Sequence, residues 1–121
     1  MNGKNKSLGK TGEDAAANYL IEQGYRICKR NYRVPTGEID IIAKKGDTIV
    51  FIEVKTRRSL SCGTPAQSVG YYKQQKIIQT ARWFLRQGQI EGCPCRFDVI
   101  EVYVFSERTF KIRHLRGAFE V

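Results

Sequence analysis

The sequence predicts an α/β domain in which a mixed five-stranded sheet is flanked by two helices. Two segments place apolar residues at the three- and four-residue spacing of an amphipathic helix, and five others alternate or run apolar as strands do. Their order is helix, three strands, helix, two strands, which is typical of a sheet covered by helices. No repeat, low-complexity segment or linker divides the chain, so we expect a single domain over residues 1–121.

Capping residues and glycines set the expected limits of the two helices. The first is predicted over residues 9–23, with Ser7 or Thr11 as the N-terminal cap and Gly24 as the stop. The second is predicted over residues 73–88 and also ends on a glycine. A polar loop precedes the second helix. The strands are predicted at 25–34, 37–45, 48–58, 96–105 and 109–115.

The second and third strands are predicted to form a hairpin whose register can be derived from its turn. Gly46-Asp47 suits a two-residue type II′ turn, which requires glycine in the first position. With this turn the numbers of facing residues sum to 93, so Asp40 faces Glu53. Side chains directly opposite each other share a face of the sheet. The hairpin is therefore expected to bring two carboxylates together.

The charged residues near this pair suggest a chemical role. Lys55 projects to the same face as Glu53, and the register places Glu38 opposite Lys55. Facing carboxylates destabilise a sheet unless a cation compensates or a pKa rises. A divalent metal such as Mg²⁺ or Mn²⁺ would supply that cation, and Lys55 could stabilise charge on a reacting phosphate. The alternative is a surface cluster in which Lys55 only neutralises Glu38 and Glu53.

Each predicted helix carries a polar residue on its apolar face. Glu13 lies about 20° from Leu20 around the first helix, so its carboxylate is expected to point at the sheet. The alternative explanation is that Glu13 favours the helix dipole from the first turn. Gln74 lies in the apolar sector of the second helix, where we favour a capping or solvent-edge role.

Charge favours a polyanionic partner. The chain has 21 Lys and Arg against 12 Asp and Glu, a net charge of +9, which suits nucleic acid or, with less support, an acidic membrane surface. Residues 54–90 contain seven basic residues, no acidic residue, and the aromatic Tyr71, Tyr72 and Trp83. A solvated helix face is the alternative. We expect contacts with nucleic acid from Lys10, Arg57, Arg58, Lys73, Gln74 and Lys76.

Other classes of protein fit the sequence poorly. The four cysteines lack the spacing of a zinc site and are expected to be free thiols in a reducing compartment. The N-terminal segment has no apolar stretch to serve as a signal sequence, and the longest apolar run is residues 49–52. We therefore expect a cytoplasmic protein without a membrane partner. The lone His114 is expected to be structural.

The motifs resemble those of a known nuclease superfamily. "GxxGExxA" at residues 9–16, "GEIDIIA" at 37–43 and "VFIEVKTR" at 50–57 are similar to the PD-(D/E)xK superfamily with its restriction-endonuclease-like core. The match is close to the YraN-like family of bacterial proteins and is similar in plan to archaeal Holliday junction resolvases. It extends to "GTPAQSVGYYKQQKI" and "RFDVIEV". The nominal proline before Asp40 is replaced by Ile39, and Gln74 is followed by Ile78 where related nucleases have tyrosine.

This resemblance implies roles for specific residues. Asp40 and Glu53 would hold Mg²⁺ or Mn²⁺ with the carbonyl of Val54, and Lys55 would be the catalytic lysine. Glu13 would border the metal site and take part in catalysis through a second metal or its water. The expected function is metal-dependent DNA endonuclease activity, selective for DNA structure rather than sequence. Branched DNA and single-stranded ends are candidate substrates, and a homodimer or a partner protein is left open. Alternatives are a nucleic-acid-binding module with this fold but little turnover, and an interaction protein with a purely structural acidic cluster.

Overall fold

The fold is an α/β arrangement of seven elements in the predicted order. The computed structural model describes residues 7–58, 69–106 and 108–121. The helices are α1 (Leu8–Glu22) and α2 (Tyr71–Gln87). The strands are β1 (Arg26–Val34), β2 (Gly37–Lys45), β3 (Thr48–Arg58), β4 (Cys95–Val104) and β5 (Phe110–Phe119). The polar loop before the second helix, residues 59–68, and Glu107 lie outside the described residues.

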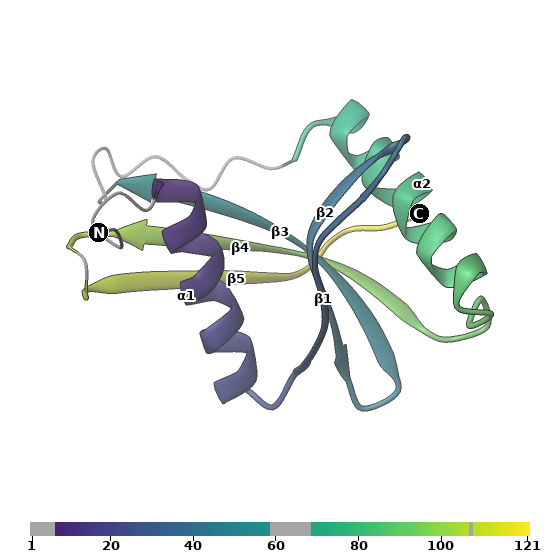
Figure 1. Cartoon of the computed structure of the whole chain (residues 1–121), viewed down its shortest axis with the longest axis horizontal. Coiled ribbons are helices and arrows are strands. Elements are labelled where there is room, and N and C mark those ends of the chain that lie inside the picture. The colour runs from purple at the N-terminus through teal and green to yellow at the C-terminus, as the bar shows by residue number, and fades with distance from the viewer. Residues whose placement is uncertain (1–6, 59–68, 107) are drawn as a thin grey trace.

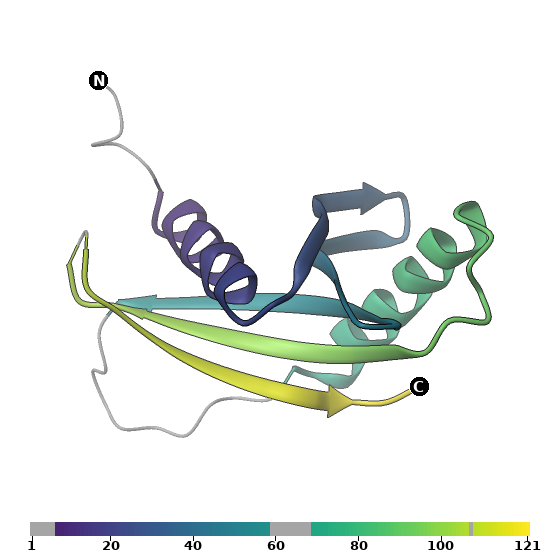
Figure 2. The same ribbon diagram turned by 90° about the horizontal axis from the view of Figure 1, so that it is seen from below.

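The five strands form one mixed sheet in the spatial order β1-β2-β3-β4-β5. Neighbouring strands are antiparallel except for β3 and β4, which are parallel and joined by the crossover through α2. Alternate residues of β3 and β4 enter two separate cores, because successive side chains of a strand point to opposite faces. Val50, Ile52 and Ile100 pack with α1, whereas Phe51 and Val99 pack with α2. Figure 2 shows α1 on one face of β3–β5 and the β1–β2 hairpin standing away from those strands.

Helix α1 packs closely against β3 through a glycine. Ser7 caps the helix by accepting a hydrogen bond from the Lys10 N–H at 3.1 Å, which confirms one of the two predicted caps. Gly12 is buried, and a Cβ atom there would lie 1.9 Å from Thr56 Oγ1 and 2.7 Å from Thr56 Cβ. Glycine at this position therefore allows the N-terminal half of α1 to approach the third strand.

The hairpin turn agrees with the prediction. Gly46 has a φ of 57°, and Asp47 is not among the described non-glycine residues with positive φ, as a type II′ turn requires. Five pairs from Lys45–Thr48 to Ile41–Ile52 follow the predicted register. The tip of the other hairpin, between β1 and β2, rests on α2, where Thr36 Oγ1 and Thr80 Oγ1 are 3.3 Å apart. Figure 1 shows this hairpin beside α2 and α1 near the opposite end of the sheet.

Two further predictions concern the cysteines and the membrane. Cys28, Cys93 and Cys95 are free thiols, as expected, and Cys62 lies outside the described residues. Neither α1 nor α2, the helices in the described ranges, combines the length and the apolar character needed to span a membrane.

Candidate functional site

Asp40 lies where β2 separates from β3. The ladder between these strands ends at Ile41 and Ile52, while β3 continues to Arg58. Beyond the ladder, Asp40 Oδ2 accepts a hydrogen bond from the Val54 N–H at 2.8 Å. The predicted pairing of Asp40 with Glu53 in a β-ladder is therefore wrong. At this point the main chain of β3 forms a hydrogen bond with the side chain of Asp40 and not with the main chain of β2. The N–H and C=O of one residue point to the same side of a strand, so the Val54 carbonyl also faces β2.

The carboxyl groups of Asp40 and Glu53 nevertheless interact. Burial, followed by repulsion from Glu53, raises the pKa of Asp40 from 3.8 to about 7, although the Val54 N–H opposes the rise and Glu13 and Glu38 add to it. Burial also raises the pKa of Glu53, against the opposing effects of Lys73, a hydrogen bond with Asp40, and Lys55. Near neutral pH the metal-free pair therefore tends to retain a proton.

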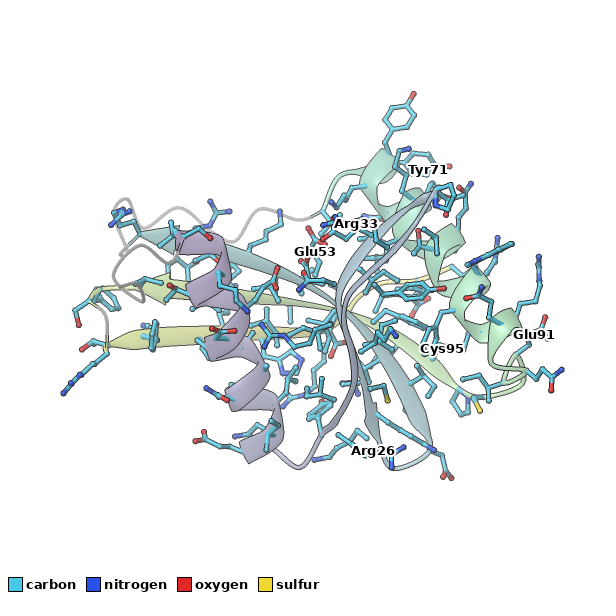
Figure 3. The ribbon with its side chains drawn as sticks, viewed as in Figure 1. Arg26, Arg33, Glu53, Tyr71, Glu91 and Cys95 are labelled. Carbon is cyan, nitrogen blue, oxygen red and sulfur yellow. The ribbon has the colours of Figure 1, made fainter. Side chains whose placement is uncertain are left out.

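Two lysines from different elements partly compensate this pair. Lys55 comes from β3, and its positive charge lowers the pKa of Glu53. Lys73 comes from the first turn of α2, with its Nζ 3.6 Å from Glu53 Oε2. Figure 3 shows Glu53 beneath the N-terminal end of α2, with Tyr71 pointing away from the body of the protein. We predicted Lys73 as a nucleic-acid contact only, so its role beside Glu53 is an addition from the structure.

Glu13 approaches the pair from α1. Its side chain is 19% exposed, its Oε1 lies 3.7 Å from Arg30 Nη2, and its charge raises the pKa of Asp40. The dipole explanation for Glu13 is wrong, because the first turn of α1 contains no acidic residue. Arg30 also binds Asp14 at 2.8 Å. Sequence reasoning missed Arg30 and Asp14, since the bridge between α1 and β1 depends on how these elements pack.

Glu38 does not occupy its predicted position opposite Lys55 in a ladder. Its ladder partner is Arg33 of β1, and Arg33 Nη2 lies 3.3 Å from Glu38 Oε2. The ladder from β2 to β3 has ended before Glu38 is reached. The proposed neutralisation of Glu38 by Lys55 therefore does not follow from the strand register.

The predicted nucleic-acid contacts divide into paired and outward-facing residues. Lys10 pairs with Asp14 at 3.4 Å, and Arg57 Nε lies 4.0 Å from the buried Glu101 Oε2. Gln74 Nε2 donates to the Val69 carbonyl at 2.7 Å, which ties the chain before α2 to its first turn. It does not cap the helix, because among the described residues no side chain bonds the free N–H groups at the start of α2. Arg58 and Lys76 are exposed.

A metal would find a small set of oxygen ligands here. Within residues 7–58, 69–106 and 108–121, no group of three or more His, Cys, Asp or Glu side chains could hold a metal ion. Asp40, Glu53 and the Val54 carbonyl could offer three oxygen ligands, and water would have to complete the coordination, as suits Mg²⁺, which prefers oxygen and retains several waters. The raised pKa of Asp40 is consistent with a metal site. Without a cation, protonation relieves the repulsion between Asp40 and Glu53, and a bound cation would compensate the same repulsion. Glu13 would act from outside these ligands.

A second polar cluster lies under α1, away from this site. His114 Nε2 is 2.7 Å from Asp98 Oδ2, and Tyr19 Oη is 2.9 Å from His114 Nδ1. Arg96 donates two 2.8 Å hydrogen bonds to the Asp98 carboxylate, and the Gly117 N–H donates another at 2.9 Å. Burial would raise the pKa of Asp98, but hydrogen bonds from His114, Arg96 and Gly117 outweigh it and lower the pKa to about 2. These contacts support a structural role for His114.

Comparison with known proteins places the chain in a family. Residues 12–102, which include Glu13, Asp40, Glu53 and Lys55, match the model described as "Uncharacterised protein family UPF0102". The chain belongs to the UPF0102 family. UPF0102 proteins from Clostridioides difficile and Alkaliphilus oremlandii are similar to it, with 45% identity over 115 residues and 48% over 117. In both comparisons the match covers 95% of this chain, and it covers 98% and 99% of the relatives respectively.

A solved structure is similar at a lower level. "The structure of Pyrococcus Furiosus SfsA in complex with Ca2+" matches with a TM-score of 0.43 and 14% identity, over 90% of this chain and 64% of that one.

Proposed function

We propose that this UPF0102 protein is a metal-dependent DNA endonuclease of the PD-(D/E)xK type. The observation that carries the proposal is the half-buried pair of Asp40 and Glu53, two carboxyl groups whose pKa values are both raised, beside two lysines where β2 leaves β3. A purely structural ion-pair cluster would not require two like charges to be buried together, because burial without a matched cation costs free energy. A bound cation removes that cost.

Each residue has a distinct task in this proposal. Asp40, held by the Val54 N–H, and Glu53, held by Lys73, are oriented before a substrate arrives. Mg²⁺ or Mn²⁺, when bound, would polarise the phosphodiester and lower the pKa of a water. Lys55 stabilises negative charge on the phosphate. Glu13, whose carboxylate forms an ion pair with Arg30, orients water from the α1 side of the site.

DNA is the favoured substrate because of the charge around the site. The net charge is +9, and residues 54–90 contain no acidic residue. Phosphate neutralisation by Lys and Arg supplies most nonspecific affinity for nucleic acid and weakens as salt rises. The proposed selectivity is for DNA structure rather than for DNA sequence.

The test is cleavage of end-labelled DNA by purified protein. Single-stranded, duplex, flapped and four-way-junction forms of one sequence would be incubated with Mg²⁺, with Mn²⁺ or with chelator, and the products resolved on denaturing gels. We expect metal-dependent cleavage of at least one form. Asp40→Asn, Glu53→Gln and Lys55→Met should each reduce the rate by about 100-fold or more. Asp47→Asn, which removes an exposed carboxylate from the hairpin turn, is the matched control and should leave the rate unchanged.

The variants also identify contaminating nucleases. Cleavage that survives all three site substitutions would come from another protein and would refute the proposal for this chain. DNA binding without cleavage under any metal condition would favour the alternative, a binding module that keeps the fold and lacks turnover. In that case the Asp40 and Glu53 variants should leave binding roughly intact.

A further inference from the structure

The outer face of α2 carries aromatic and basic side chains in a single stripe. Positions three and four residues apart lie on one side of a helix. None of the buried residues of α2 belongs to this stripe; they are Ile77, Ile78, Thr80, Ala81 and Leu85. The outer stripe is exposed throughout. It comprises Tyr72, Lys76, Gln79, Trp83 and Arg86.

The two rings of this stripe are open to solvent. Tyr72 is 84% exposed and Trp83 is 43% exposed, although large aromatic side chains are usually buried where a fold can cover them. Eleven residues of helix separate them, about 16 Å along the axis. At the rise of roughly 3.4 Å per nucleotide of a stacked strand, this distance spans about five nucleotides.

The charge of the helix complements a phosphate backbone. Residues 71–87 include four basic residues and no acidic one. Arg86 is 3.9 Å from Glu91, but both side chains are more than half exposed, so this ion pair is weak and readily exchanged. Lys76 lies between the two rings on the stripe. Cations interleaved with stacking surfaces are the usual composition of sites for single strands.

Other occupants fit this face less well. A protein groove that receives a helix contacts aliphatic anchors spaced along one side, and the aliphatic residues of α2 already face the core. A membrane would require the same apolar face. Bases paired in a duplex are stacked on one another and present no free face to Tyr72 or Trp83. An unpaired strand offers both bases and phosphates.

The N-terminal end of the stripe, at Tyr72, lies beside the candidate site. Lys73, one residue from Tyr72, contacts Glu53 at 3.6 Å. We propose that the outer face of α2 binds single-stranded DNA, with bases stacked on Tyr72 and Trp83 and phosphates held by Lys76 and Arg86, and that it guides a single-stranded end or flap to Asp40 and Glu53. The guiding step rests on the proposed nuclease function, whereas the binding step does not.

Binding can be measured without catalysis in a chelator buffer. Trp83 is the only tryptophan of the chain, so quenching of its fluorescence by oligothymidylate reports stacking at this ring directly. Fluorescence anisotropy of the labelled oligonucleotide gives Kd for wild type and variants. We expect Tyr72→Ala and Trp83→Ala each to weaken binding about 5–150-fold, and Trp83→Phe to retain most of it. Phe105→Ala, which removes a ring that is 47% exposed after β4, is the matched control and should bind as wild type.

Three results would overturn the inference. They are unchanged Trp83 fluorescence at saturating oligonucleotide, wild-type affinity in Tyr72→Ala and Trp83→Ala, and binding of a duplex of the same length as tightly as the single strand. Circular dichroism and melting of each variant exclude unfolding as the cause of a loss. Because the assay contains no metal, absence of cleavage cannot produce these results. Conversely, cleavage without stacking would leave the carboxylate site standing and refute only this surface.

Discussion

Replacing Asp40 with asparagine should stabilise the metal-free protein, and the gain should grow as pH rises. Burial and Glu53 raise the pKa of Asp40 from 3.8 to about 7 in the folded protein. The unfolded chain therefore releases this proton first, and between those values it binds fewer protons than the native state. Stability from this group is present below the ordinary pKa and is lost as pH rises through about 7.

The magnitude follows from the two pKa values. Each pH unit between them is worth about 1.4 kcal/mol, so the penalty reaches about 4 kcal/mol once Asp40 is fully ionised. At about pH 5 about 1.6 kcal/mol of it has been incurred, by the same conversion. Allowing for solvent screening at this partly exposed residue, Asp40→Asn should gain about 1–2 kcal/mol relative to wild type between about pH 5 and pH 8. Asparagine can still accept the Val54 N–H hydrogen bond, so the local fold is retained.

The assay is urea denaturation followed by circular dichroism, in chelator, at both pH values. Asp47→Asn provides the matched control, because it makes the same substitution at a carboxylate that is exposed in the turn. A difference between Asp40→Asn and wild type that is equal at the two pH values would show that Asp40 titrates normally. The argument for a strained carboxyl pair, and with it the fit to a cation, would then fail.

Three other predictions concern stability and metal binding. Gly12→Ala should destabilise the protein by about 1–3 kcal/mol or more because its Cβ would overlap Thr56, whereas Gly9→Ala in the same helix meets no atom within 4 Å and should be neutral or stabilising in urea titrations. Asp98→Asn should cost about 3–5 kcal/mol in the same assay by breaking the ion pair of the buried Asp98 with Arg96 and disturbing its hydrogen bond with His114, and a loss below about 1 kcal/mol would contradict this. Mn²⁺ should raise the melting temperature of wild type, measured by scanning fluorimetry, but not that of Glu53→Gln, and equal shifts in both would place the metal elsewhere.

Much of the fold follows from local signals in the sequence. The period of the apolar residues located both helices, and Gly46-Asp47 fixed five pairs of the central hairpin in their observed register. The same signals placed Glu53 and Lys55 on the face opposite Val50 and Ile52. These features depend on neighbouring residues and on the regular geometry of strands and helices.

Features that depend on packing could not be predicted in this way. A register derived from the turn predicts a ladder that continues to the ends of both strands. In the structure the β1–β2 hairpin is instead held against α2, where the Tyr32 hydroxyl donates to Gln87 Oε1 at 2.8 Å, a contact between residues 55 positions apart. Asp40 therefore meets the Val54 N–H rather than a ladder partner. Contacts of Glu53 with Lys73, and of His114 with Tyr19 and Asp98, likewise join residues distant in sequence. Only the folded chain reveals these partners.

The contact of Gly12 with Thr56 has an evolutionary consequence. Gly12 immediately precedes Glu13 in α1. Because Gly12 has no Cβ atom, α1 can lie close to Thr56 of β3, and this short distance also brings the Glu13 backbone close to the third strand. A larger residue at position 12 would be tolerated only with a smaller one at position 56, and the two substitutions should be strongly non-additive. Among UPF0102 sequences we therefore expect these two positions to change together, and lineages that lose the close approach to be free to lose Glu13 as well.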